Sequence, residues 1–89
     1  MKIIKQASAG TMESSDAYVE IEPRDNGLDI HIESVVEQQF GEKIEATVRE
    51  VLAEFDLNDA EVRIVDRGAL ECVIRARVET AIQRGGGEV

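Results

Sequence analysis

Two segments of alternating apolar and polar residues flank a polar break near the N-terminus, and no other sequence feature restricts the fold as strongly. After the break, Ala17, Val19 and Ile21 alternate with polar neighbours, and a weaker extended pattern covers residues 3–9 before it. Alternation with a period of two is typical of strands that bury one face. The break itself, residues 11–16, contains two Ser and one Asp, whose side chains hydrogen-bond to nearby backbone in turns. We therefore predict a β-hairpin with an exposed tip.

The next segments predict a third strand and a long helix. Residues 23–27 (Pro-Arg-Asp-Asn-Gly) are a strong turn signal, and residues 28–32 then alternate as a further strand of an antiparallel meander. Ser34 and Glu37 have the spacing of a capping box, which marks the start of a helix. The apolar residues of this helix recur at steps of three and four over about twenty residues. They are Val36, Phe40, Ile44, Val48, Val51, Leu52 and Phe55.

The C-terminal third contains one clear strand and one ambiguous segment. The alternation at residues 62–64 predicts a fourth strand, which ends at the turn signal of residues 66–68. Residues 69–79 fit a strand or a helix, and the length of the segment up to Arg84 favours the helix. Arg77 then falls within the apolar stripe of that helix. Such an arginine must pair with an acid, extend its stem towards solvent, or bind an anion.

Together these elements predict an α+β fold. Two helices on one face of a four-stranded antiparallel sheet would form a two-layer domain. The 89 residues suffice for a single small domain, which we place at residues 1–84. Residues 85–89, three Gly followed by Glu and Val, are expected to form a flexible C-terminal tail.

The composition argues against several classes of function. Ten Lys and Arg stand against nineteen Asp and Glu, and the resulting net charge of −9 repels nucleic acids and anionic membranes. Without a secretion signal or an apolar run of about 20 residues, the chain is expected to be cytoplasmic. Nine of the acids lie within residues 6–42, where Arg24 is the single basic residue. This distribution favours solvation of exposed faces and attraction to basic partner surfaces.

No catalytic or metal-binding constellation is expected from the sequence. A single cysteine cannot form an intramolecular disulfide, and Cys72 is expected to be a buried small apolar residue. His31 is expected to be an exposed strand residue without a catalytic partner. No Cys/His cluster or calcium-loop spacing is present, so no metal site is expected. Arg75, Arg77 and Arg84 could bind an anionic group, and for Arg77, which is expected to be partly buried, a salt bridge is favoured instead.

Three blocks of the sequence resemble the acyl carrier proteins of citrate lyase, the gamma subunits of that enzyme. They are residues 9–16 (AGTMESSD), 37–41 (EQQFG) and 66–79 (DRGALECVIRARVE). The resemblance implies a subunit that carries acetyl and citryl thioesters while citrate is cleaved to acetate and oxaloacetate. It also implies a covalently attached arm, 2'-(5''-phosphoribosyl)-3'-dephospho-coenzyme A. In the family this arm is esterified to the first serine of a Glu-Ser-x-Asp element, which matches Ser14.

The resemblance further implies the partners. They are an alpha subunit (acyl transferase), a beta subunit (citryl lyase) and a holo-synthase that attaches the arm, so the carrier itself would have no active site. The chemistry of the tip does not separate Ser14 from Ser15 as the acceptor, but the family register favours Ser14. Two alternatives stay open: the carrier subunit of malonate decarboxylase, which uses the same kind of arm, and a non-catalytic acidic adaptor module.

Overall fold

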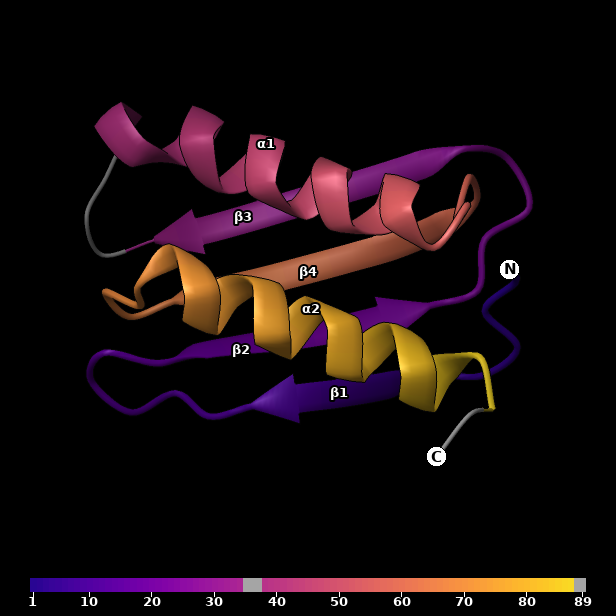
Figure 1. The fold of residues 1–89 in the computed structure, drawn as a ribbon, viewed down its shortest axis with the longest axis horizontal. Helices are drawn as coiled ribbons and strands as arrows, with labels where there is room; N and C mark the ends of the chain where they lie inside the picture. The colour runs from indigo at the N-terminus through magenta and orange to yellow at the C-terminus, as the bar shows by residue number, and fades with distance from the viewer. Residues whose placement is uncertain (35–37, 88–89) are drawn as a thin grey trace.

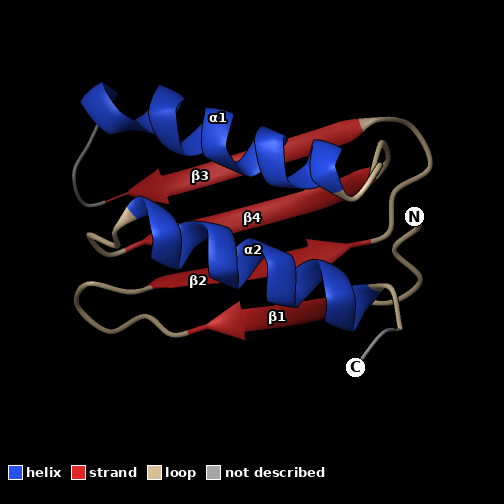
Figure 2. Ribbon diagram, in the orientation of Figure 1, coloured by secondary structure: helices blue, strands red, loops and turns tan. Residues whose placement is uncertain are grey.

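The computed structural model describes residues 1–34 and 38–87, which form a four-stranded sheet with two helices on one face (Figure 1). In chain order the elements are β1 (Ala7–Gly10), β2 (Ala17–Glu22), β3 (Leu28–Ser34), α1 (Gln38–Glu54), β4 (Ala60–Asp66) and α2 (Glu71–Gly85). Figure 2 shows both helices lying over the same side of the strands. The predicted two-layer α+β architecture is confirmed, and the ambiguous segment at residues 69–79 belongs to a helix from Glu71 onward.

The sheet is mixed, so the predicted purely antiparallel sheet is wrong. Its strand order is β1-β2-β4-β3, in which β2 pairs antiparallel with β1 and β4, whereas β3 and β4 are parallel. The cause is α1, because a helix between two strands returns the chain to the end of the sheet where the first strand began. β4 then enters the sheet between β2 and β3. Alternation of apolar residues reports which face of a strand is buried, but not which strand lies beside it.

The core lies between the sheet and the helices. Cα pairing of Val19 with Ile64, and of Ile32 with the same Ile64, places alternate residues of three strands on the helix side. The fully buried apolar residues of β2 and β4 are Ala17, Val19, Ile21, Ala60, Val62 and Ile64. From α1, the core receives Ile44, Val48, Val51 and Leu52, as the stripe predicted. Val36 and the side chain of Phe40 lie outside the described residues, and so does Glu37 of the expected capping box.

Cys72 is exposed, and the expectation that it is buried was wrong. The buried residues of α2 are Ile74, Val78, Ala81, Ile82 and Gly85. Two residues correspond to about 200° of rotation in an α-helix, so Cys72 faces away from the core when Ile74 faces into it.

The end of α2 is tied to the N-terminus. The carbonyl oxygen of Gly85 accepts hydrogen bonds from the backbone N–H groups of Ile4 (2.9 Å) and Lys5 (3.2 Å). A Cβ at position 85 would lie 3.0 Å from Cγ2 of Ile21, so the site suits glycine. Residue 85 is therefore part of the packed helix rather than of the expected tail, and the flexibility of the residues after it stays a prediction. Neither α1 nor α2, the helices of the described residues, is long and apolar enough to cross a membrane.

Candidate functional site

The tip of the β1–β2 hairpin, residues 11–16, lies at one end of the sheet beside the loop that joins β4 to α2 (Figure 1). The hairpin leaves β1 at Gly10, whose φ of +93° favours glycine. A Cβ there would overlap the carbonyl oxygen of Ala17 and would lie 3.1 Å from Cδ of Arg77. Gly10 therefore allows the two strands and the arginine stem to close around the base of the tip.

A tight turn presents Ser14. The N–H of Asp16 donates to the carbonyl oxygen of Glu13 (3.1 Å), which makes Ser14 and Ser15 the two central residues of the turn. Ser15 has a φ of +68°, and its N–H donates to the carbonyl oxygen of Arg67 (2.8 Å). Ser14 is exposed, and among the described residues its hydroxyl has no hydrogen-bond partner. The turn thus holds the backbone in place and leaves the Ser14 hydroxyl accessible.

Asp16 is the centre of the hydrogen bonds that fix the tip. Its two carboxylate oxygens receive Nε and Nη2 of Arg77, each at 2.9 Å, in a bidentate pair. The Thr11 hydroxyl and the N–H of Ala17 donate to the same carboxylate, each at 2.7 Å. The hydrogen bonds from Arg77, and then those from Thr11 and Ala17, hold the pKa of the Asp16 carboxyl well below its usual range. The carboxylate is charged at neutral pH, and α2 is fastened to the tip through it.

Comparison with known proteins shows the family of this chain. The family model described as "ACP: Malonate decarboxylase delta subunit (MdcD)" matches residues 4–85. A citrate lyase acyl carrier protein of Haemophilus influenzae (strain PittEE) is 57% identical over 88 residues, covering 99% of this chain and 92% of the relative. This chain belongs to the citrate lyase acyl carrier protein family. Relatives with the same name are 54% identical in Escherichia fergusonii, over 94% of this chain and 88% of the relative, and 48% identical in Lactococcus lactis, with the same coverage.

The fold also recurs in a solved structure. A chain of a Pseudomonas malonate decarboxylase hetero-tetramer, crystallised in complex with malonate, superposes with a TM-score of 0.77. The match covers 97% of this chain and 93% of that chain, at 23% sequence identity. At this identity the match shows a shared fold. In this chain the hairpin tip is presented by a mixed sheet and two helices.

All three arginines singled out in the sequence bind acceptors within the protein. Arg77 binds Asp16, which confirms the salt bridge favoured for it, and Arg75 binds Glu50 (2.9 Å) and Glu54 (2.6 Å) of α1. Nη1 of Arg84 donates to the carbonyl oxygen of Ser8 (2.8 Å), a backbone contact. The sequence analysis did not identify the hydrogen bond from Thr11 to Asp16 within the tip, or the contact of the tip with the backbone of Arg67. The turn signal at residues 66–68 marked the loop that contains Arg67, but sequence spacing does not show that this loop lies beside the tip.

His31 lies outside the tip, on the face of the sheet opposite the helices. Nε2 of His31 is 3.1 Å from Oδ2 of Asp29 and 3.9 Å from Oε2 of Glu61. The donor atoms of this group lie within 4.8 Å of one another. Sequence reasoning missed the cluster because the parallel pairing of Asp29 with Glu61 joins residues far apart in the chain. The side chains are half exposed; the contact of His31 with Asp29 lies within β3, and its contact with Glu61 joins β3 to β4.

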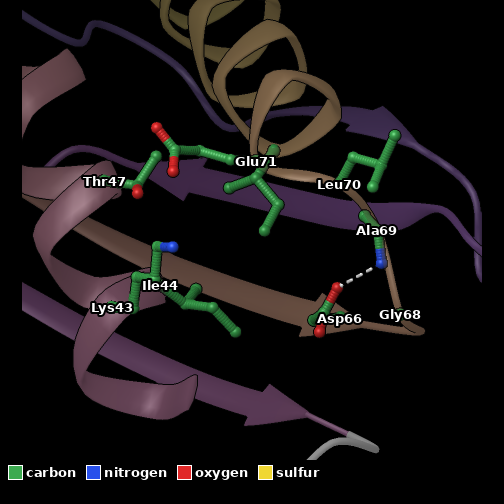
Figure 3. A pocket seen from close by; sticks show the side chains of 9 residues that line it. Lys43, Ile44, Thr47, Asp66, Gly68, Ala69, Leu70 and Glu71 are labelled. Carbon is green, nitrogen blue, oxygen red and sulfur yellow. Dashed lines mark hydrogen bonds between the residues drawn. The ribbon is translucent and has the colours of Figure 1, made fainter.

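A pocket of about 310 Å³ opens between the first half of α1 and the start of α2, along the β4–α2 loop whose backbone is bonded to the tip at Arg67. Figure 3 shows Lys43, Ile44 and Thr47 on the α1 side, facing the β4–α2 loop. The lining residues are Lys43, Ile44, Thr47, Asp66, Gly68, Ala69, Leu70, Glu71 and Ile74. The Asp66 side chain accepts hydrogen bonds from the Ala69 N–H and the Ser34 hydroxyl, each at 2.9 Å. These bonds fix the loop that forms one side of the pocket.

Proposed function

We propose that this protein is the acyl carrier subunit of a citrate lyase complex, with the phosphoribosyl-dephospho-coenzyme A arm esterified to Ser14. The observation that carries this proposal is the exposed Ser14 hydroxyl at the corner of a braced turn, in a chain of this family. When attached, the arm supplies a thiol that carries the acyl group as a thioester.

The tip fits such an arm. An acceptor hydroxyl must be open to the transferase, and the Ser14 side chain is exposed and free of hydrogen bonds within the described residues. The carboxylate two residues after Ser14, that of Asp16, is already engaged by Arg77, Thr11 and Ala17. None of the described residues hydrogen-bonds to the Ser14 hydroxyl as a base would, so activation of the hydroxyl is assigned to the attaching enzyme.

The partners proposed for this carrier are the alpha acyl transferase, the beta citryl lyase and the holo-synthase, all in the cytoplasm. Acyl exchange and carbon–carbon cleavage take place in the alpha and beta subunits, and this chain presents the arm to each of them. A tether makes the acyl group an intramolecular reactant at both sites, which raises its effective concentration. The chain is therefore proposed to have no active site of its own.

The test is co-expression with the holo-synthase system and the other lyase subunits, followed by intact-mass measurement. Ser14→Ala should fold like the parent, keep its unmodified mass and support no citrate cleavage. Ser15→Gly is the matched control, because glycine accepts the positive φ of position 15 and removes only the neighbouring hydroxyl. It should gain the arm. If Ser14→Ala gains mass and Ser15→Gly does not, the attachment site is Ser15.

The malonate decarboxylase carrier is the second candidate, and it is favoured by the description of the matching family model. The two candidates are separated by reconstitution. The arm-bearing chain is mixed with alpha and beta subunits of citrate lyase in one reaction and with the remaining malonate decarboxylase subunits in another. We expect turnover in the reaction with the citrate lyase subunits and none in the reaction with the malonate decarboxylase subunits. A parent chain that never gains mass in either host system would favour the acidic adaptor module instead.

A further inference from the structure

The pocket and Ser14 belong to the same braced end of the molecule. Arg67 lies between two pocket residues, Asp66 and Gly68, and its backbone is bonded to the tip. Its carbonyl oxygen accepts the N–H of Ser15, and its N–H donates to the carbonyl oxygen of Asp16 (2.9 Å). The side of the pocket and the turn that presents Ser14 are therefore joined by direct backbone hydrogen bonds.

The size and lining of the pocket suit the end of a flexible chain. Small-molecule sites range from about 300 to 1,000 Å³, and this pocket, at about 310 Å³, is at the lower limit. Ile44, Ile74 and Leu70 provide apolar surface, and Leu70 is 70% exposed at the start of α2. The Thr47 hydroxyl and the Lys43 ammonium group add hydrogen-bond donors. Such a site takes a short amphipathic group, and it is too small for a nucleotide together with a long chain.

We propose that this pocket is the resting site of the thiol end of the arm and of the acyl group on it, an inference that rests on the attachment to Ser14 proposed above. Anchoring at the tip keeps the end of the arm at a high effective concentration beside the pocket, so weak contacts suffice to hold it. The apolar side chains contact the alkyl part of the arm and the acetyl methyl group, and the donors face the carbonyl oxygens. Occupancy shields the carbon–sulfur bond from water during transfer between partners.

The direct test compares two forms of the arm-bearing protein, one with a free thiol and one acetylated on that thiol, by amide NMR. The two forms differ only at the far end of the arm, so a change near Ser14 caused by attachment cancels in the comparison. Acetylation should shift the amides of Gly68, Ala69 and Thr47. Those of Glu22 and Arg63, on the opposite face of the sheet, should not move. Unchanged pocket amides would overturn the inference, as would shifts that occur only when a partner subunit is added.

The rate at which the acetylated arm is hydrolysed in a pocket variant tests the resting site by a second measurement. Ala69→Leu places a larger side chain in the pocket lining and keeps the backbone N–H that binds Asp66. Ala76→Leu is the matched control, because Ala76 is exposed on α2 and does not line the pocket. Water attack on the acetylated arm releases acetate and the free thiol, and this release should be several-fold faster in Ala69→Leu than in the parent and in Ala76→Leu. Equal rates in all three proteins would contradict the proposal.

The two proposals fail in different ways. A parent protein that gains no mass overturns the attachment to Ser14 and the resting site with it. A parent that gains the arm on Ser14 but shows no pocket shift on acetylation overturns the resting site alone. If Ala69→Leu does not fold, the NMR comparison on the parent protein still decides the question, because it needs no variant.

Discussion

At the scale of single residues, the pair between Arg77 and Asp16 is the contact on which the geometry of the tip most depends. We expect Arg77→Gln to lower the rate of arm attachment several-fold and to speed hydrogen exchange of the Ser15 amide, because the bidentate hold on Asp16 is lost. Arg75→Gln is the matched control, since it removes an arginine of the same helix that binds α1 instead. An equal loss of attachment in both variants would show that α2, rather than the tip, was disturbed.

The same pair predicts a pH dependence of stability. The pKa of Asp16 is lowered in the folded protein from its ordinary value of 3.8, so its contribution is present above that value and is lost as the pH falls through the lowered pKa. The gap in unfolding free energy between the parent and Arg77→Gln should therefore be full at neutral pH and shrink in acid below about pH 4. Urea unfolding across this range measures it. A gap that does not change with pH would remove Asp16 as its source.

Cys72 provides a third test at this scale. Because its side chain is exposed, Cys72→Ser should change the unfolding free energy by no more than about 0.5 kcal/mol. In the protein without the arm, the thiol should react with a thiol reagent under native conditions. The variant should still gain the arm and carry acyl groups. A thiol that reacts only after unfolding would show that the helix is rotated from the position described above.

At the scale of elements, the hairpin depends on Gly10. Gly10→Ala should destabilise the protein by about 2 kcal/mol or more, because the positive φ is strained for alanine and the Cβ overlaps the backbone of Ala17. Gly27→Ala is the control, since its φ is also positive (+80°) but a Cβ there meets no atom within 4 Å. It should cost about 1 kcal/mol. If denaturant unfolding gives the same loss of stability for both variants, backbone strain at the positive φ, and not the overlap of the Cβ with Ala17, determines the effect.

The element scale also shows how far the sequence could lead. The alternating segments and the stripe of α1 were predictable, because burial of one face leaves a periodic trace at positions such as Val19, Ile21 and Val48. The position of β4 beside β2 was not, since a strand buried on one face shows the same alternation beside any neighbour. For the candidate site, the family register predicted Ser14, and attachment there stays a proposal. The partner of Asp16 could not be found that way, because Arg77 lies 61 residues away along the chain.

At the scale of the whole molecule, part of the negative charge lies together on one surface. The face of the sheet opposite the helices carries five carboxylates, with Arg63 and His31 among them, according to the strand registers. The carboxylates are Glu20, Glu22, Asp29, Glu33 and Glu61. The association rate with the lyase subunits should fall as salt rises, since the screening length is about 8 Å at 0.15 M. A rate that is constant from about 0.02 to 0.5 M salt would exclude steering by this charge.

The central position of β4 has a consequence for biosynthesis. On the ribosome, β2 and β3 emerge before their common neighbour β4, so a nascent chain that ends before Ala60 has open strand edges and no completed sheet. Arg77, which fastens the tip, emerges later still. The turn that presents Ser14 is therefore completed only when almost the entire chain has been translated. A transferase that recognises the braced turn would act on finished carriers and pass over unfinished ones.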